Sequence, residues 1–240
     1  MPDRLTLLDD THRGRLCAYG IYYQESVVQR AFPLHWHTFY ELELVVGGRG
    51  TQWINGHAMA LFPGVFYLLS PTDLHRLHAD AMLTVLSVKL PEDLLADRVE
   101  KLLHMYDAPV MALLHGEGYE ICHSDFLRLK ALLSNPSPYG GERVAALVTL
   151  LLTALYGSAG SGQSFRPGMA FQRQHAVLKY IHENYLKQIP LKEIASVAGL
   201  TPNHFCTQFS KVAGCSFVEY HTRLRIQHAC TLLTETRMSV

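Results

Sequence analysis

The 240 residues are enough for two hydrophobic cores, and no apolar run among them is long enough to cross a bilayer. The first fifteen residues lack the apolar core of a signal peptide, and the five scattered cysteines form no C-x-x-C pair, so we expect a soluble, cytoplasmic protein without a disulfide framework. The formal net charge is zero, but residues 171–240 carry eight basic and four acidic side chains, whereas residues 1–170 carry 13 and 17. Such asymmetry is typical of a protein in which only one part meets phosphate.

Residues 19–90 consist of short apolar or alternating runs that are separated by turn residues. Residues 40–44 alternate with the period of a strand, and Asn55-Gly56 is a strong hairpin signal. The Pro-Gly pair at 63–64 opens a further strand. Several strands at this spacing predict an antiparallel sandwich or a small barrel.

Imidazole and carboxylate side chains form a second pattern within this predicted barrel. His35, His37 and Glu41 give H-x-H-x-x-x-E, and His75 follows later. Alternation places His35 and His37 on one face of a strand, and these ligand types suit zinc, nickel, iron or manganese. The pattern resembles the cupin fold, whose two motifs supply three histidines and a glutamate to a metal inside a barrel. Asp73 departs from the second motif, which usually has glycine at that place.

The aromatic residues of this region have two interpretations. They either stack on a ring-shaped ligand or fill the core, and they are Trp36, Phe39, Trp53, Phe66 and Tyr67. Trp53 joins the four residues of the histidine pattern as a candidate effector-binding residue.

Residues 92–157 are predicted to be helical on the strength of three amphipathic segments, at residues 92–105, 124–133 and 142–156. The third segment is apolar over more than half of its circumference. It is therefore either buried on the chain's own barrel or part of a subunit interface, and the pattern alone leaves both open. The Gly- and Ser-rich run that follows predicts a flexible linker, which we place at residues 158–169.

Residues 191–200 predict a helix that ends in a tight turn. An apolar stripe at helical spacing marks the buried side of this helix, at Leu191, Ile194, Ala195 and Ala198. Gly199 permits the sharp turn. Thr201 can cap the next helix, and Pro202 suits its first position. Helix, tight turn and capped helix are the order of a helix-turn-helix unit.

The second helix has one apolar and one polar side. Phe205, Phe209 and Val212 are expected to be buried, and the opposite side carries Asn203, Cys206, Thr207 and Ser210. Ser216 and Glu219 have the spacing of a capping box, which opens a third helix that runs to about residue 234. An ordinary three-helix bundle has the same periodicity, but the compact spacing favours DNA binding.

These residues resemble the DNA-binding domain of AraC-type transcription regulators. The resemblance covers about residues 175–240 and is carried by Ile194, Ala195, Gly199, Leu200, Thr201, Phe205, Phe209, Ser210, Lys211, Gly214, Cys215, Ser216, Phe217, Tyr220, Arg225, Ala229 and Leu233. In that family two helix-turn-helix units are joined by a long helix. This sequence matches the first unit and the linking helix and stops at Val240, about where the second unit begins, so we expect either a shortened chain or a naturally short regulator.

The resemblance implies an α+β protein of two domains. An N-terminal antiparallel cupin-like barrel with following helices binds a small effector, often a sugar or a related metabolite, and an all-α helix-turn-helix bundle binds DNA as a homodimer. The domains are expected at residues 1–91 (barrel and N-terminal arm), 92–157 (helical dimerisation or packing segment), 158–169 (linker) and 170–240 (helix-turn-helix). No cofactor is required, although a divalent metal at His35, His37, Glu41 and His75 is an open alternative to direct effector binding there.

The polar side of the second helix supplies candidate DNA-reading residues. Asn203 can read adenine bidentately, Thr207 can touch a thymine methyl, and Cys206 offers only shape or apolar contact. His204 and Gln208 flank these positions. Lys211, Arg223 and Arg225 are candidate phosphate contacts, and Arg225 is alternatively a structural ion-pair partner.

Our sequence-based hypothesis is therefore an effector-controlled transcription regulator and not an enzyme. The alternative is a metal-dependent cupin dioxygenase or isomerase that uses the histidine pattern, which leaves the helix-turn-helix without a purpose. A third interpretation is a shortened regulator that binds effector and dimerises but holds DNA weakly.

Overall fold

The structure is a computed structural model that describes residues 6–7, 16–37, 39–71, 73–91, 110–159 and 169–235. Eleven strands are present in these ranges, and they are β1 (Thr6–Leu7), β2 (Leu16–Ala18), β3 (Ile21–Val28), β4 (Ala31–Trp36), β5 (Phe39–Gly47), β6 (Gly50–Ile54), β7 (His57–Leu61), β8 (Val65–Leu69), β9 (His75–Ala79), β10 (Leu83–Pro91) and β11 (Val110–Leu113). The helices are α2 (Gly116–Ser134), α3 (Gly140–Ala159), α4 (Met169–Asn184), α5 (Leu191–Val197), α6 (Pro202–Ala213) and α7 (Phe217–Glu235).

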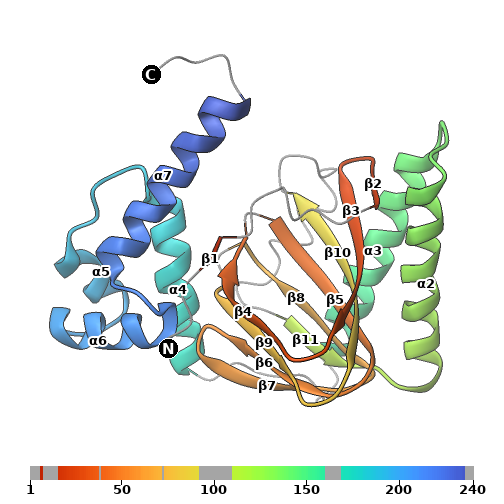
Figure 1. Ribbon diagram of the computed structural model, residues 1–240, viewed down its shortest axis with the longest axis horizontal. Helices are drawn as coiled ribbons and strands as arrows, with labels where there is room; N and C mark the ends of the chain where they lie inside the picture. Colours follow the sequence, from red (N-terminus) through yellow and green to blue (C-terminus); the bar gives the residue numbers. More distant parts are fainter. Residues whose placement is uncertain are drawn as a thin grey trace.

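The strands form two hydrogen-bonded sheets that face each other as a sandwich (Figure 1). The first sheet has the order β1-β4-β9-β6-β7 and the second has the order β11-β8-β5-β10-β3-β2. The pairs are antiparallel except for β1, which runs parallel to β4. The prediction of an antiparallel, cupin-like domain is confirmed, with two separate sheets in place of a closed barrel.

Each sheet alternates between an inner and an outer face because successive side chains of a strand point to opposite sides. The apolar part of the inner space is filled by side chains from both sheets, including Val45, Ile54, Leu61, Tyr67, Leu77 and Val85. The outer face of the second sheet is covered by α2 and α3, which lie together on one side of the sandwich in Figure 1. Leu42 and Leu44 of β5 meet Phe126 of α2 and Leu151 of α3 in this layer.

The predicted helical segment at residues 92–157 is partly wrong. Residues 110–113 form β11, an edge strand paired with β8, because Val110 and Ala112 point into the core between strand and helices. The segments predicted at 124–133 and 142–156 are confirmed within α2 and α3. The helix predicted at 92–105 lies outside the described residues, as does most of the predicted linker, and α3 continues to Ala159.

The C-terminal helices pack around a separate core of aromatic and aliphatic side chains. Phe205 and Phe209 of α6 contact Phe217 at ring-centroid distances of 5.6 and 5.9 Å, and Tyr220 joins them. Helix α4, which the sequence patterns did not single out, supplies Val177, Leu178 and Ile181 to the same core. Three side chains of the sandwich also belong to it, namely Leu34, Trp36 and Leu74, so the two domains are in apolar contact.

Candidate functional site

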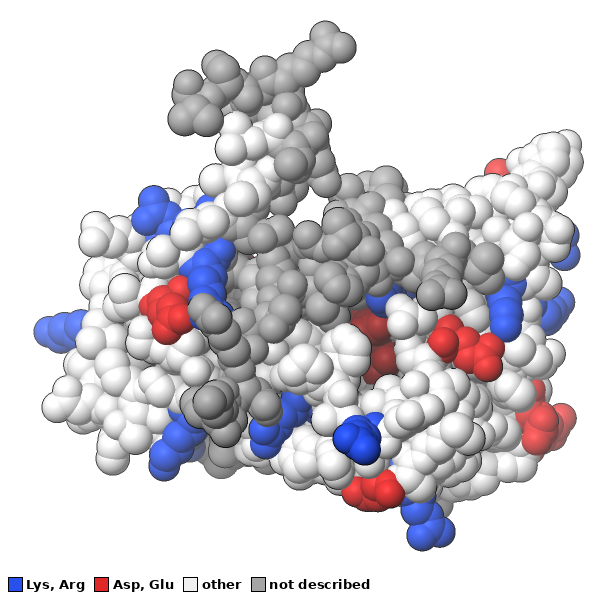
Figure 2. Space-filling model, in the orientation of Figure 1, with Lys and Arg blue, Asp and Glu red and all other residues white. Residues whose placement is uncertain are grey.

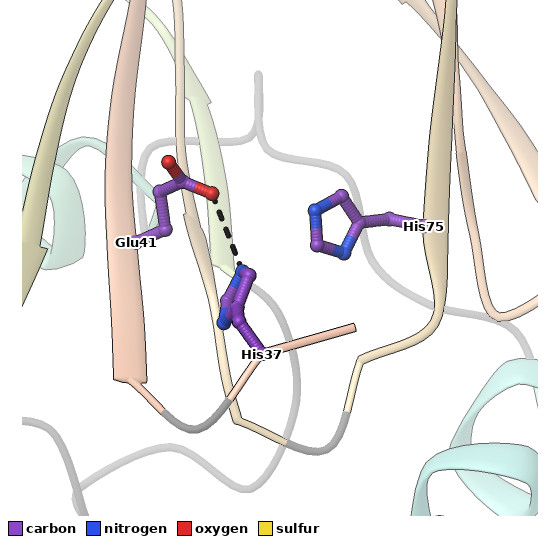
Figure 3. A group of neighbouring side chains, drawn as sticks. All are labelled: His37, Glu41 and His75. Carbon is purple, nitrogen blue, oxygen red and sulfur yellow. Dashed lines mark ion pairs between the residues drawn. The ribbon is translucent and has the colours of Figure 1, made fainter. Parts of the chain in front are cut away.

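Three of the four residues of the histidine pattern come together inside the sandwich. His37 follows β4, Glu41 lies on β5 and His75 begins β9, and one ligand atom from each lies within 4.8 Å of the others. Figure 3 shows the three side chains pointing toward a common space, from the segment after β4, from β5 and from β9. All three are buried, with 0%, 8% and 3% of their surfaces exposed. We refer to His37, Glu41 and His75 as the inner triad.

Hydrogen bonds at the edge of the site orient the imidazoles. His75 Nδ1 lies 3.0 Å from the backbone oxygen of Asp73, so when it donates there its Nε2 carries the lone pair. Burial lowers the pKa of His75 to about 4, which keeps the ring neutral near pH 7. His37 Nε2 lies 3.3 Å from Glu41 Oε2, but among the described residues neither ring nitrogen of His37 has a partner in hydrogen-bonding geometry.

Glu41 supplies the negative charge of the triad. Burial acts to raise its pKa, but the His37 ring and the nearby Lys89 outweigh burial and lower the pKa below its usual value. The Ser87 hydroxyl donates to Glu41 Oε1 at 2.6 Å. A carboxylate beside two imidazole rings is a donor set that suits a divalent first-row cation.

His35 stands beside the triad and not in it. It pairs directly across from His75 in the β4–β9 register, and the two ring centroids are 3.9 Å apart. Its Nδ1 lies 2.8 Å from the backbone oxygen of Pro33, and burial lowers its pKa to about 2. His35 is therefore a neutral residue that lines the site. Of the four residues predicted as possible metal ligands, three come together and His35 lies beside them.

The expectation that Trp53 lines the site does not agree with its position. Trp53 pairs with Arg76, and the Arg76 guanidinium carbon lies 4.7 Å from the Trp53 ring centroid on the outer face of the first sheet. Its neighbours Gln52 and Ile54 point inward instead, on the same face as His75. Trp36 also points outward, whereas Phe39 stacks on His37 at a centroid distance of 4.1 Å.

Several inward polar residues were missed by the histidine pattern. Gln52 and Tyr67 are almost fully buried; within the described residues Gln52 Oε1 has no hydrogen-bond partner, and the Tyr67 hydroxyl lies beside the Glu43 carboxyl group. Glu43 lies opposite Tyr67 in the β5–β8 register, and desolvation together with the Glu41 charge raises its pKa to about 8. The alternation of residues 40–44 already placed Glu43 on the face of Glu41, so this signal could have found it.

The helix-turn-helix unit agrees closely with its prediction. Thr201 caps α6 by accepting a hydrogen bond from the backbone N–H of His204 at 3.4 Å, and Gly199 makes the turn at a φ of 64°. Ile194, Ala195 and Ala198 are buried as expected, but Leu191 is 38% exposed because it begins the helix at the surface. The Ser216 hydroxyl accepts from the backbone N–H of Glu219, as in a capping box.

The predicted reading face of α6 is open to solvent. Phe205 and Phe209 are buried, Val212 is half-buried, and the exposed residues are Asn203, His204, Cys206, Thr207, Gln208, Ser210 and Lys211. The Thr207 hydroxyl donates to the backbone oxygen of Asn203 at 3.1 Å, which leaves its methyl group as the outward contact. Arg225 is exposed on α7, and Arg223 is paired with Glu219. On the face drawn in Figure 2, Lys and Arg predominate over these helices, whereas the sandwich carries both signs.

Fold and sites together define a ligand-binding domain with a polar interior joined to a helix-turn-helix domain with an open reading face. Residues 19–152 match the AraC-like ligand binding domain family, and residues 194–240 match a helix-turn-helix domain family. The chain belongs to the AraC-like ligand binding domain family and carries a helix-turn-helix domain after it.

The chain is also similar in part to one named relative and to several solved structures. The lactose operon transcription activator of Staphylococcus xylosus is 41% identical over 63 residues, which are 26% of this chain and 22% of that protein's length. The structure of the AraC-like transcriptional activator CuxR is 15% identical, with 89% of this chain and 78% of that chain covered and a TM-score of 0.45. The unsaturated fatty acid-bound ToxT of Vibrio cholerae strain SCE256 is 10% identical, with 92% and 82% covered and a TM-score of 0.45. Among the helices that the structure describes, none has the length and apolarity to cross a membrane.

Proposed function

We propose that the protein is a sequence-specific, DNA-binding transcription regulator whose action is controlled by a small molecule bound inside the sandwich. The observation that carries the proposal is the exposed polar face of α6, held outward by the buried Phe205 and Phe209, in a chain of the AraC-like ligand binding domain family. The likeness of 63 residues to a transcription activator favours an activating role. Such a regulator works in the cytoplasm, where promoter DNA lies. The helix-turn-helix match favours this function over a cupin enzyme.

In the proposed complex α6 enters the major groove. Asn203 reads an adenine through two hydrogen bonds, and the Thr207 methyl contacts a thymine. Lys211 and Arg225 contact phosphates and fix the register of the helix. His204, Cys206 and Gln208 line the groove beside the two readers.

Selection of binding duplexes from random sequence, followed by titration of the purified chain, tests this assignment. Asn203→Ala should relax preference at one base pair and cost about 1–3 kcal/mol there. Lys211→Ala should weaken all duplexes alike and lower the slope of log K against log salt by about 1. Ser196→Ala, at an exposed position of α5 outside the reading face, is the matched control. An unchanged sequence preference in Asn203→Ala would reject the assigned reading face.

We also propose that the chain acts as a homodimer through α2 and α3. Both helices keep large apolar side chains in solvent, with Ile121 54% and Leu150 53% exposed. The hydroxyls of Thr149 and Thr153 donate to backbone oxygens of their own helix, so this face of α3 offers methyl groups. Leu150→Glu should shift the sedimentation of the chain toward a monomer, whereas Glu142→Gln on the same helix should not. A wild-type monomer at high protein concentration contradicts the proposal.

For the effector we propose a small polyhydroxylated molecule such as a sugar or a related metabolite. Its hydroxyl groups both donate and accept, which matches the unpartnered inward Oε1 of Gln52 and the donor capacity of a protonated Glu43. A thermal-shift screen of sugars and polyols against wild type and Gln52→Met tests this class: a hit should stabilise the wild type and lose affinity in the variant. Stabilisation by apolar compounds alone contradicts it.

The inner triad supports a further proposal, that the site also takes a divalent cation. His37, Glu41 and His75 would hold the ion through two imidazole nitrogens and a carboxylate, and the ion would bind hydroxyl groups of the effector. Titration calorimetry with Zn²⁺ and Ni²⁺ should show one site per chain that Glu41→Gln weakens by at least tenfold. The exposed His78→Asn variant should bind as the wild type does. Equal binding by Glu41→Gln and the wild type would contradict the site.

A further inference from the structure

Strand β4 connects the two proposed sites because its alternate side chains face different domains. His35 points into the sandwich beside the inner triad, and His37 joins the triad directly after the strand. Leu34 and Trp36 point the other way and are part of the helix-turn-helix core. The Trp36 ring centroid lies 5.2 Å from that of His182 on α4 and 6.1 Å from that of Tyr220 on α7. A displacement of the β4 backbone on one side therefore moves contacts on the other.

A second connection runs through the turn before β9. The backbone oxygen of Asp73 meets His75 of the inner triad, while its carboxylate is completely buried toward the other domain. Asp73 Oδ1 lies 3.4 Å from His175 Nδ1 on α4. Asp73 is also the residue that departs from the cupin motif, which usually has glycine there. The position that departs from the cupin motif is therefore one that contacts the helix-turn-helix domain.

The carboxylate of Asp73 is satisfied within its own domain even without His175. Asn55 Nδ2 donates to it at 2.7 Å, and the backbone N–H and hydroxyl of Ser70 donate at 2.7 and 2.8 Å. The His175 contact is the longest of these, so it can break without leaving a buried charge unpartnered. A contact of this kind suits an interface with two states better than one required for folding.

The Asn55-Gly56 hairpin turn adds a third contact, this time with the recognition helix. A Cβ atom at Gly56 would lie 3.0 Å from Val212 Cγ2, near the end of α6. The turn is joined to the Asp73 segment because the Asn55 backbone N–H donates to Leu74 O at 2.7 Å. The docked arrangement therefore fixes the orientation of α6 while Asn203 and Thr207 remain exposed.

We propose that Trp36 and Asp73, with His175, His182 and Tyr220 on the opposite side, form a releasable lock between the domains, and that occupancy of the inner triad is transmitted to the recognition helix through this lock. The proposal rests on the effector-controlled function proposed above and specifies its regulation. Since the reading face stays open in the locked state, the lock controls the direction in which α6 is presented, and so the fit of two copies to two half-sites, and not access to DNA.

The difference in ligand affinity between locked and released states sets how far a ligand can shift the equilibrium. A substitution in the inner triad should therefore change the fraction of molecules in the locked state even without a ligand. When a residue of the lock is substituted as well, the effects of the two substitutions on this fraction should be non-additive. A double-mutant cycle measures this coupling directly.

The chain contains two tryptophans, so Trp53→Phe leaves Trp36 as a reporter of docking. In this background, the acrylamide quenching and emission maximum of Trp36 are measured for four full-length proteins: the parent, Glu41→Gln, His175→Gln and the double variant. Glutamine at 175 retains a hydrogen-bond donor, and Asp73 keeps its Asn55 and Ser70 partners, so folding should persist. His182→Gln provides a second cycle from the other side of Trp36.

Each substitution changes the equilibrium constant for docking by some factor. In the double variant, the change in this constant should differ from the product of the two single factors by about threefold or more. Glu25→Gln is the matched control, because Glu25 pairs with Lys130 on the outer surface and has no contact with the lock. It should combine with His175→Gln additively. Additivity within a factor of two in both the Glu41 and the control cycles would overturn the proposal.

The same proteins separate this proposal from the proposed function. Their affinities for a duplex selected from random sequence should follow the docking equilibrium. Failure of every protein to prefer any duplex would remove the transcriptional function but leave the Trp36 cycle as a valid test of coupling. Sequence-specific binding with a strictly additive cycle would remove the lock and leave the function.

Discussion

The interiors of the two domains contain different kinds of side chains. The inner space of the sandwich contains buried polar groups such as His37, Glu41 and Gln52, whereas the helix-turn-helix core contains Phe205, Phe209 and Phe217 in edge-on contact. Burying a polar atom without a partner costs free energy, and burying a phenylalanine gains it. The sandwich therefore buries the groups of its proposed site at a cost in stability, whereas the helical domain keeps the groups proposed to read DNA at its surface.

The largest expected effect follows from removing part of the apolar interior. Phe209→Ala should reduce the free energy of unfolding of the helical domain by about 3–5 kcal/mol, because a ring that is 4% exposed is replaced by a cavity. Urea denaturation monitored by circular dichroism measures the change. Cys206→Ala on the exposed side of the same helix should alter stability by less than about 0.5 kcal/mol. Comparable losses in both variants would show that α6 is not anchored by its phenylalanines.

A smaller effect of opposite sign is expected inside the sandwich. Gln52→Met keeps the side-chain length but removes the unpartnered Oε1, so it should stabilise the ligand-free protein by about 1 kcal/mol. Gln24 is the matched control, because its Nε2 donates to Ser26 and its Oε1 accepts from Lys89 at 2.9 Å. Gln24→Met should destabilise the protein. If both methionine variants lose stability alike, the inner space is not kept polar for a ligand.

The smallest expected effect is a pH dependence of the contact between the domains. Burial lowers the pKa of His182 to about 4, against the opposing charge of Asp73, so the docked ring is neutral. Between pH 6.5 and 4 the released form binds more protons than the docked form, and docking should weaken as the pH falls through this range. Trp36 quenching in the Trp53→Phe background measures it. His182→Gln, which can keep the hydrogen bond to the Tyr220 hydroxyl, should make docking depend less on pH. An equally steep pH dependence in that variant would show that a group other than His182 takes up the proton.

The helical domain could be predicted from sequence because its signals are local. The spacing of Phe205 and Phe209, the Thr201 cap and the Gly199 turn all act within one or two helical turns, and the structure has them as expected. The expectation that Leu191 is buried was wrong, because an apolar stripe indicates which side of a helix faces the core but not which end of the helix lies at the surface. Alternation correctly put His35 and His37 on one face. Trp53 was a candidate because an aromatic ring can stack on a ligand, but the polar Gln52 holds the inner position.

The connection between the domains could not be predicted from local patterns. Asp73 and His175 are 102 positions apart, and nothing in the spacing around either residue indicates the other. Asp73 was noticed only as an exception to a motif. Trp36 had two interpretations, ligand contact and core, and it proved to be core for the neighbouring domain, which depends on how the domains dock.

The two-faced geometry of β4 has a practical consequence for turning this fold into a biosensor. In the proposed regulation, redesign of effector preference at positions 35 and 37 would also alter the docking of the helical domain, because Trp36 lies between them. Other strands also have positions that face this space, such as Gln52 on β6 and Tyr67 on β8. Neither residue lies on β4, so neither is next to Trp36 in the sequence. A retargeting library should therefore randomise those strands first and leave β4 unaltered, so that new specificity is gained with the original switching retained.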